Sequence, residues 1–396
     1  MRAGPVPIEN HGIIGDLRTV ALVGADGTID WLCFPHFDSP SVFAALLDPE
    51  RGGHFRLSPE LEGVVRKQFY WPDTNVLVTR FYTADGVGEI IDFMPMSTGA
   101  HRKHPREILR RVRVVRGAMA FQLECFPAFN YGRDPHTSKL IPGGASFLSE
   151  RQSLTLSTKL KLEVGPRGVS ARFKLHAGQS QVFTLREGAP ESCADTVHSH
   201  ESAEVLFRET VDYWRRWLSK CTYKGRWREM VQRSALALKL LTFEPTGAIV
   251  AAPTCSLPES PGGVRNWDYR YTWLRDAAFT VYAFLRVGFK EEAGAFMRWL
   301  EARCAELPDD APLSLMYSID GSRVPPEEEL SHLSGYGGAR PVRIGNAAAD
   351  QLQLDIYGEL MDSVYLYNKH GAPISYDFWR HLRRLVDWVC DHWQER

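Results

Sequence analysis

The sequence predicts a multidomain β + α chain, in which an N-terminal antiparallel β-sandwich is followed by α-helices. Two observations predict this division. In the first half, short runs rich in β-branched and aromatic residues are separated by Gly or Pro turns, as is typical of antiparallel sandwiches. After residue 198, apolar residues recur at helical spacing and no strand pattern interrupts them. The predicted domains are a β-sandwich over 1–198, a linker helix over 199–224 and a helical domain over 225–396.

The strands of the first half are recognised by composition and alternation. GADGTIDWLCFP at 24–35 predicts a hairpin, because Asp-Gly is a strong turn signal. VLVTRFYT at 76–83 and GEIIDFMPM at 88–96 predict two strands joined by a turn. Residues 107–127 hold two runs broken at Arg116-Gly117. SLTLSTKLKLEVG at 153–165 alternates apolar and polar residues, which predicts a half-buried strand.

The second half predicts antiparallel helices joined by loops of uneven length. After the linker helix, apolar residues repeat at helical spacing over 227–243, 272–288, 290–306, 347–369 and 376–396. The loops 244–271 and 307–346 are long, and long loops in a compact helical domain usually carry function. Both loops combine Gly and Pro with aromatic residues, Arg and carboxylates, and both run directly into a helix. They therefore predict one shared pocket.

Composition excludes several classes of function. The 396 residues are 44% hydrophobic and 24% charged, with a net charge of −1, which is typical of a globular protein and argues against nucleic-acid binding. The sequence has no apolar run of the ~18 residues that span a membrane, and its first residues lack a signal-peptide core. These features predict a cytoplasmic protein. The seven Cys and thirteen His show no metal-ligand spacing, so we expect neither a metal nor a cofactor.

The segment NWDYRYTWLRDA at 266–277 places two Asp and two Arg among four aromatic rings, directly before a predicted helix that is apolar nearly all round. Asp276 suits the first turn of that helix, whereas Arg275 opposes the helix dipole there and requires an ion pair or a ligand. Aromatic faces beside carboxylates and guanidiniums are suited to binding sugars. A structural Arg–Asp pair that caps a buried helix explains the same pattern, and the residues alone leave both interpretations open.

Three other groups of polar residues are candidates for chemistry. Glu327-Glu328-Glu329 is typical of a solvated face or a helix start. Asp355 and Glu359 share one face of a predicted helix; they could serve as paired carboxylates for glycoside hydrolysis, or each could have an Arg partner. The Gly spacing in 338–351 fits neither a dinucleotide-binding fingerprint nor a P-loop.

At these segments the chain resembles glycoside hydrolase family 15, the glucoamylases and the bacterial and archaeal trehalases. The resemblance is carried by 8–48, by APTCSLPE at 252–259, by RNWDYRYTWLRDA at 265–277 and by 332–362, and it extends over essentially the whole chain. It implies an N-terminal antiparallel β-sandwich followed by an (α/α)6 barrel, with the active site at one end of the barrel.

The resemblance also implies a set of substrate-binding residues. The family motif Y-x-Y-T-W-x-R-D is matched at 269–276, where the Arg-Asp pair would bind the hydroxyls of the non-reducing glucose and the first Tyr would lie near the developing oxocarbenium. The G-x-R-P segment is matched more loosely at 338–341, and three further polar residues are its neighbours. The implied substrate-binding residues are Tyr269, Trp273, Arg275, Asp276, Arg340, Arg343, Asn346 and Gln351.

The chain departs from the family in its catalytic carboxylates. Family members invert: one Glu protonates the glycosidic oxygen and another activates water. The resemblance places both Glu in segments beyond the one matched by 376–396, so no catalytic residue is assigned, and about five barrel helices are expected where the family has twelve. We therefore expect a partial (α/α)6 barrel that is C-terminally incomplete and has no activity alone. Self-association or a completing partner chain would cover its apolar faces.

The expected substrate is a small α-glucoside, and the expected reaction is the inverting hydrolysis of trehalose to glucose. Trehalose is favoured because a cytoplasmic location suits a small disaccharide. A glucoamylase-like glucan 1,4-α-glucosidase acting on malto-oligosaccharides is the alternative within the family. A non-catalytic glucoside-binding or assembly remnant is the alternative from another class.

Overall fold

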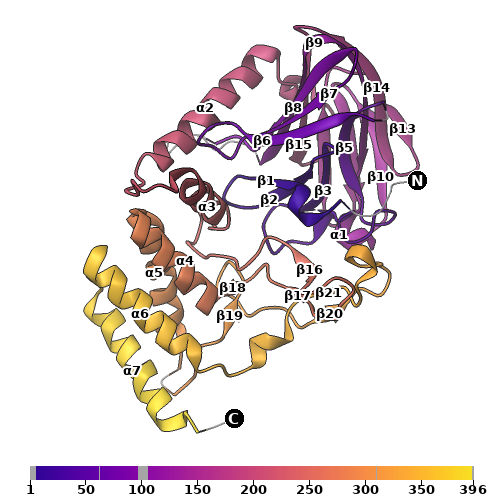
Figure 1. The fold of residues 1–396 in the computed structure, drawn as a ribbon. Helices are drawn as coiled ribbons and strands as arrows, with labels where there is room; N and C mark the ends of the chain where they lie inside the picture. The colour runs from indigo at the N-terminus through magenta and orange to yellow at the C-terminus, as the bar shows by residue number, and fades with distance from the viewer. Residues whose placement is uncertain (1–5, 62, 97–105, 309, 395–396) are drawn as a thin grey trace. The chain divides into compact units, whose positions relative to one another are not determined.

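The computed structural model describes residues 6–61, 63–96, 106–308 and 310–394, and the chain forms two compact units (Figure 1). Unit 1 comprises Met1–Leu218 and Leu333–Gly338, and it holds the large sheet. Unit 2 comprises Ser219–His332 and Ala339–Arg396, and it holds the helices α3 to α7.

Unit 1 is a sheet structure in which each strand pairing among the described residues is antiparallel. The longest path of hydrogen-bonded neighbours runs β1-β2-β3-β5-β9-β15-β12-β11-β10. The elements are β1 (His11–Gly15), β2 (Val20–Gly24), β3 (Thr28–Cys33), β4 (Ser41–Phe43), β5 (His54–Pro59), β6 (Val65–Tyr70), β7 (Leu77–Tyr82), β8 (Gly86–Phe93), β9 (Glu107–Phe126), the short helix α1 (Phe129–Gly132), β10 (His136–Ile141), β11 (Gly144–Ser149), β12 (Ser153–Ser157), β13 (Glu163–Gly165), β14 (Gly168–His176), β15 (Ser180–Glu187) and α2 (His200–Leu218).

Strand β9 joins the two layers of the sandwich. Its first half pairs with β15 and β8, and its second half pairs with β5 and β14. The direction changes at Gly117, which has a φ of 71° and lies so close to the backbone of Asp85 that a Cβ would meet the Asp85 carbonyl oxygen at 1.9 Å. The break predicted at Arg116-Gly117 is therefore a bend within one strand, and Gly allows it because the left-handed conformation costs Gly little.

Two of the β predictions are confirmed and one is wrong in extent. The hairpin at 24–35 appears as the turn between β2 and β3, and 76–83 with 88–96 appears as the β7–β8 pair. The alternating segment 153–165 is not one strand: β12 ends at Ser157 and β13 begins at Glu163. The strand is interrupted because its two parts have different partners: β12 pairs with β15, whereas β13 pairs with β14.

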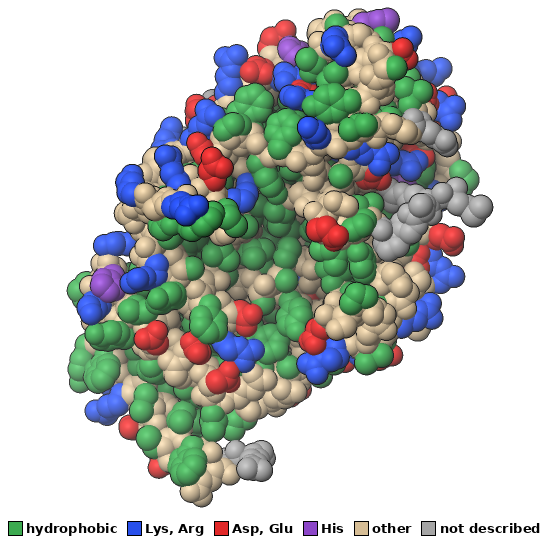
Figure 2. Space-filling view, in the orientation of Figure 1, with side chains coloured by type: hydrophobic (Ala, Val, Ile, Leu, Met, Phe, Trp, Pro, Cys, Tyr) green, Lys and Arg blue, Asp and Glu red, His purple; other side chains and the backbone are tan. Residues whose placement is uncertain are grey.

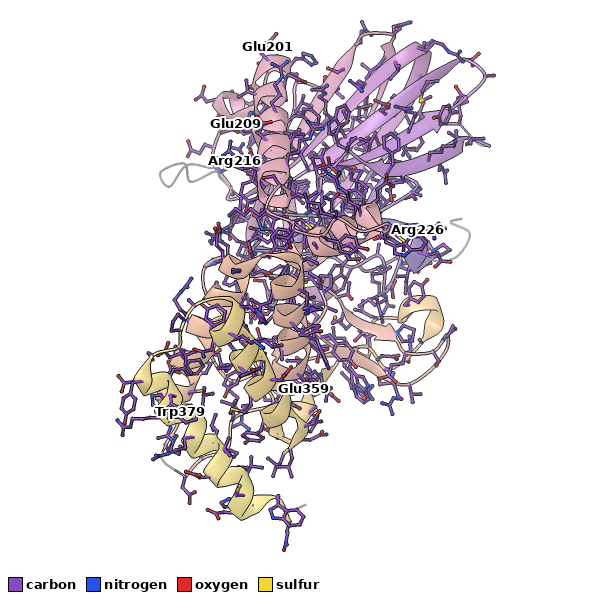
Figure 3. All side chains as sticks on the ribbon, turned by 60° about the vertical axis from the view of Figure 1, so that its left-hand side comes forward. Glu201, Glu209, Arg216, Arg226, Glu359 and Trp379 are labelled. Carbon is purple, nitrogen blue, oxygen red and sulfur yellow. The ribbon has the colours of Figure 1, made fainter. Side chains whose placement is uncertain are left out.

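Helix α2 packs on the sandwich of unit 1. The backbone N–H of Met96 donates to the hydroxyl of Thr210 at 3.0 Å, and Arg111 forms an ion pair with Glu204 at 2.6 Å. The ring of Phe207 makes an edge contact with that of Trp71, with 5.2 Å between centroids. Figure 3 shows Glu201, Glu209 and Arg216 along the same helix.

Unit 2 contains the predicted helices with short strand pairs between them. Its elements are α3 (Arg228–Leu240), β16 (Cys255–Pro258), β17 (Asn266–Asp268), β18 (Thr272–Trp273), α4 (Leu274–Val287), α5 (Lys290–Glu306), β19 (Met316–Tyr317), β20 (Glu328–Glu329), β21 (Arg343–Ile344), α6 (Asp355–His370) and α7 (Tyr376–His392). The strands pair as β16–β17, β18–β19 and β20–β21, all antiparallel.

Three expectations for unit 2 are corrected. The long loops are not free of strands, because they form these three pairs. The helix expected over 347–369 is divided: a 3-10 turn over Ala347–Asp350 is capped by Asn346, whose side chain accepts the Ala348 N–H at 2.9 Å, and α6 begins only at Asp355. Helix α4, whose nearly continuous apolar surface predicts burial on most faces, is buried along one side and exposes Phe279 and Tyr282, at 55% and 44%, on another.

The core of unit 2 lies between α4, α5 and α6, where the buried side chains include Val281, Phe296 and Leu360. The outer faces of α6 and α7 expose large apolar side chains, and Figure 2 shows hydrophobic side chains gathered at the lower left over these helices. These exposed residues are Tyr365, Tyr376, Trp379, Val386 and Trp393; Figure 3 labels Trp379 on α7. In the part of the chain that the structure describes, no helix is long and apolar enough to cross a membrane.

Candidate substrate-binding site

The segment around Asp268 buries its first two charged residues and leaves two of its rings partly exposed. Asp268 closes β17, Thr272 opens β18, and α4 follows at Leu274 with Trp273 extended before it. Asp268, Arg270, Tyr271 and Thr272 are buried, whereas Tyr269 and Trp273 are only partly buried. The charged residues at 268 and 270 thus face the interior, and two rings remain at the surface.

The interior pair is a two-point ion pair. Nε and Nη2 of Arg270 donate to the two oxygens of Asp268 at 2.9 and 2.6 Å, and both side chains are 1% exposed or less. The backbone N–H of Gly345 donates to the same carboxylate at 3.1 Å. Asp268 therefore ties the loop that carries it to the loop that precedes α6.

Two of the predicted site residues, Asn346 and Arg343, make further contacts between the same two loops. The amide nitrogen of Asn346, which is buried, donates to the carbonyl oxygen of Asp268 at 3.0 Å. The guanidinium of Arg343 lies over the ring of Trp267, 4.7 Å from its centroid, and its Nε is 3.1 Å from the carboxylate of Glu327. Their polar groups are engaged with the protein in this structure.

Four other predicted residues meet at the start of α4. The rings of Tyr269 and Trp273 lie with centroids 5.8 Å apart, and the Arg275 guanidinium is 5.5 Å from the centroid of the Trp273 ring. Nε of Arg275 is 3.9 Å from Oδ2 of Asp276, with the side chains 34% and 45% exposed. These four residues form a half-open surface that offers two rings, a cation and an anion.

Residues at the start of α6 and just before it bind the Arg275 guanidinium. Its Nη1 donates to Oδ2 of Asp355 at 2.7 Å and lies 3.3 Å from Oε1 of Gln353. The amide of Gln353 in turn donates to Oε1 of Gln351 at 3.1 Å, which connects this predicted residue to Arg275. Asp355 thus has an Arg partner. This agrees with the interpretation that the carboxylates of Asp355 and Glu359 are paired with Arg.

Arg340, the remaining predicted residue, stands apart. Its side chain is exposed and makes no hydrogen bond or ion pair with any of the residues that the structure describes. The sequence reasoning did not assign Asp268, Arg270 or Gln353 to the site. For Asp268 and Arg270 the signal was present as charges between rings, but only the structure, in which β17 pairs with β16 and β18 with β19, shows that these two charges are buried.

The pKa values of three groups on the half-open surface are raised, two of them by burial and one by a hydrogen bond. Burial raises the pKa of the Asp276 carboxyl above its usual value, despite the opposing effect of Arg275. The hydrogen bond to Asp355 raises the pKa of Arg275, which therefore stays a cation. Burial, and then the charges of Glu259 and Asp276, raise the pKa of the Tyr269 phenol, so that it stays neutral.

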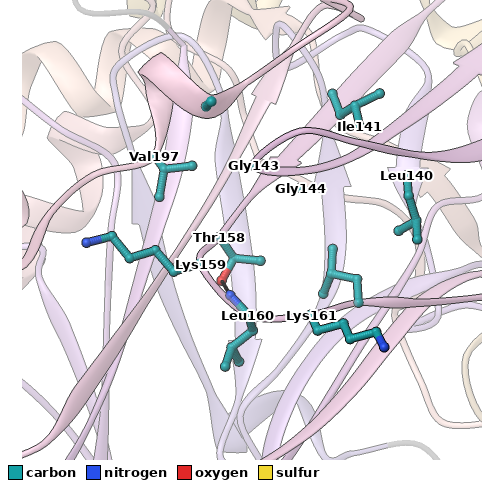
Figure 4. Close-up of a pocket in the computed structure, with 11 residues that line it drawn as sticks. Leu140, Ile141, Gly143, Gly144, Thr158, Lys159, Leu160, Lys161 and Val197 are labelled. Carbon is teal, nitrogen blue, oxygen red and sulfur yellow. Dashed lines mark hydrogen bonds between the residues drawn. The ribbon is translucent and has the colours of Figure 1, made fainter.

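A cavity of about 560 Å³ opens beside Gln351 within unit 2. Tyr317 and Leu313 contribute apolar surface to it, and Arg323 and Asp350 contribute an ion pair with an N–O distance of 2.5 Å. Unit 1 has a cavity of similar volume beside Lys159 and Lys161 (Figure 4). None of the eleven described residues that line that second cavity is aromatic or acidic, so the groups suited to sugar binding lie in unit 2.

The described residues include no cluster of three or more His, Cys, Asp or Glu that could hold a metal ion. The groups present at the start of α4 offer charged hydrogen bonds and ring contacts. A guanidinium and a carboxylate side by side suit neighbouring hydroxyl groups, and aromatic faces suit the C–H face of a sugar ring.

Comparison with known proteins gives two family matches and several relatives. Residues 225–396 match the family described as glycosyl hydrolases family 15, and residues 2–205 match the domain described as trehalase-like, N-terminal. The chain is 37% identical to a trehalase of Mycolicibacterium smegmatis over 98% of its own length and 61% of the relative's. It is 38% identical to a trehalase of Thermoplasma volcanium, over 96% of this chain and 60% of that one.

A trehalase of Mycobacterium tuberculosis is 36% identical, over 98% of this chain and 60% of the relative. The chain therefore spans about three fifths of the length of these curated relatives. The predicted fold class, an antiparallel β-sandwich followed by helices of an (α/α)6 barrel, is confirmed by the order of the two matches and by the structure.

Proposed function

Because the chain belongs to glycosyl hydrolase family 15 and carries a trehalase-like N-terminal domain, we propose that it binds the glucose unit of an α-glucoside at the start of α4. The observation that carries the proposal is the half-exposed Arg275–Asp276 pair beside the rings of Tyr269 and Trp273. Trehalose is the proposed substrate, since the curated relatives are named trehalases.

Each of the four residues has a distinct role in this proposal. Arg275 donates to sugar hydroxyls and Asp276 accepts from them, because charge-assisted hydrogen bonds are the strong ones. Tyr269 and Trp273 contact the C–H face of the ring. The indole Nε1 of Trp273 is buried and has no hydrogen-bond partner among the described residues, so the contribution of Trp273 to the proposed site is its ring face. Gln351, which is connected to Arg275 through Gln353, extends the site from the neighbouring loop. Arg340 is proposed as a sugar contact from the family resemblance alone.

The proposed reaction is inverting hydrolysis. A carboxylic acid protonates the glycosidic oxygen, a carboxylate takes a proton from water, and that water attacks the anomeric carbon from the opposite face, which yields two glucose molecules from trehalose. The resemblance assigns neither carboxyl group to a residue within 1–396. We propose that these residues bind and orient the sugar and that alone they release no glucose.

Isothermal titration calorimetry on the 396-residue chain tests the binding. We expect trehalose to bind, and Asp276→Asn to weaken binding about tenfold or more through loss of a charged acceptor. Asp387→Asn is the matched control, because Asp387 is an exposed carboxylate on α7 of the same unit, outside the cavity beside Gln351, and its partner is the exposed Arg383. A folded chain that binds neither trehalose nor maltose would contradict the proposal.

Two further outcomes separate the alternatives. Tighter binding of maltose than of trehalose would favour a glucoamylase-like specificity. Glucose released from trehalose by the purified chain would overturn the statement that residues 1–396 only bind. A coupled glucose assay at the protein concentration used for calorimetry measures this release directly.

A further inference from the structure

Arg275 lies between two carboxylates that come from different helices. Its Nη1 is 2.7 Å from Oδ2 of Asp355 and donates a hydrogen bond to it. Its Nε is 3.9 Å from Oδ2 of Asp276, which is an ion-pair distance but too long for a hydrogen bond. Arg275 is thus hydrogen-bonded to Asp355, 80 positions away, and not to its chain neighbour Asp276.

The position of Asp355 is fixed by the packing of its helix. Asp355 is the first residue of α6, and the next residue, Ile356, is buried. Leu274, the first residue of α4, is buried as well, and α4 and α6 pack together. A cation in the first turn of α4 is disfavoured by the helix dipole, so Arg275 needs an anion from elsewhere to stay there.

We propose that Asp355 is a positioning residue that holds Arg275 apart from Asp276, so that both groups remain available to the hydroxyls of the sugar. Without Asp355 the guanidinium turns to Asp276, the gap of 3.9 Å closes, and each group occupies the other. Gln353 supports the same arrangement, since its Oε1 lies 3.3 Å from Nη1 of Arg275. This inference rests on the proposed function.

Glu359 provides a matched comparison within the same helix. It follows Asp355 by one helical turn and faces the same side, and its charge acts on Arg275, but the structure shows no hydrogen bond between the two. A purely electrostatic role would make the two carboxylates similar in effect. A positioning role makes them different, because only Asp355 fixes the direction of the guanidinium.

The test begins with Asp355→Ala and Glu359→Ala in the full chain, with trehalose affinity measured by calorimetry and Tm by scanning calorimetry. We expect Asp355→Ala to weaken trehalose binding about tenfold, the effect of one charge-assisted hydrogen bond, while Tm changes little. Glu359→Ala is expected to change affinity less than twofold. Equal losses in the two variants would overturn the proposal.

A double-mutant cycle with Arg275→Gln separates positioning from direct contact with the sugar. If Asp355 acts through Arg275, Asp355→Ala has no further effect on affinity once Arg275 is replaced. Additive losses would mean that Asp355 binds the sugar itself, and the positioning role would be wrong.

A crystal structure of the unliganded Asp355→Ala variant tests the arrangement independently of any sugar. We expect Nε or Nη of Arg275 within about 3 Å of the Asp276 carboxylate. An Arg275 side chain that keeps its present position would refute the inference. If the wild-type chain binds no sugar, the proposed function fails, and this crystal structure still decides whether Asp355 holds Arg275 apart from Asp276.

Discussion

Arg270 binds Asp268, two residues before it, through two hydrogen bonds of 2.9 and 2.6 Å, and both side chains are buried. The same carboxylate accepts the N–H of Gly345 at 3.1 Å. One buried ion pair therefore fixes two loops, and the residues proposed to bind the sugar lie in these loops or at the start of α4.

Asp268→Asn is expected to destabilise unit 2 strongly. The change leaves the buried Arg270 guanidinium without its charge partner, which typically costs about 3–5 kcal/mol. Asp350→Asn removes a partner from the exposed Arg323–Asp350 pair, whose side chains are 79% and 67% exposed, and exposed pairs contribute about 0–1 kcal/mol. Urea unfolding followed by tryptophan fluorescence measures both variants. Similar losses in the free energy of unfolding for the two variants would mean that the Asp268–Arg270 pair does not hold the two loops together.

Trp273→Ala is expected to weaken trehalose binding about threefold to tenfold, because it removes a partly exposed ring that lies beside Tyr269 and Arg275. Trp273→Phe is the matched comparison. It keeps an aromatic face and loses only Nε1, which is buried and has no partner among the described residues, so affinity should change little and Tm should stay the same or rise. Calorimetric titration and thermal unfolding on the same samples measure the two effects. Equal losses of affinity in the two variants would mean that the aromatic face does not bind the sugar.

Asp276 should affect stability and binding in opposite directions. Burial raises its pKa in the folded protein, so folding favours the protonated form. The resulting contribution to stability is present below the carboxyl's unfolded pKa of about 4 and is lost as pH rises through the raised folded value. Asp276→Asn should therefore raise Tm at neutral pH, and the gain should shrink as pH falls through the raised folded pKa and vanish below about 4.

Trehalose binding should show the reverse dependence on pH. The ionised carboxylate accepts the sugar hydroxyls, so wild-type affinity should fall as pH drops through the raised pKa of Asp276. Calorimetry from pH 4 to pH 7 measures this, with Asp276→Asn as the pH-independent comparison. A wild-type affinity that is constant over this range would argue against an ionised Asp276 at the sugar.

Gly117→Ala is expected to destabilise the sandwich more than Gly178→Ala does. Both Gly have positive φ values, 71° and 85°, so both substitutions incur the strain of a left-handed residue, about 1–2 kcal/mol. At Gly117 a Cβ would also meet the Asp85 carbonyl oxygen at 1.9 Å, whereas at Gly178 it meets nothing within 4 Å. Thermal unfolding of the two variants should give a clearly lower Tm for Gly117→Ala. Equal values would mean that the bend in β9 adapts to a side chain.

The division into sandwich and helices could be predicted from sequence because the two kinds of element have different periods. The hairpin signal at Asp26-Gly27 and the helical repeat at 272–288 are local, and each is confirmed, the second by α4 at Leu274–Val287. The strand expected over 153–165 and the helix expected over 347–369 are wrong in extent, since their ends depend on which neighbours pair and on the cap at Asn346.

The sequence by itself determined the order of the two folds and the presence of rings, cations and carboxylates before α4. Only the tertiary structure decided how those charges are shared: Asp268 binds Arg270 in the interior, and Asp355 binds Arg275 at the surface. The physical reason is distance along the chain. Periodicity reports which side of one element is buried, but the partner of Arg275 lies 80 residues away and is brought to it by the packing of α6 on α4.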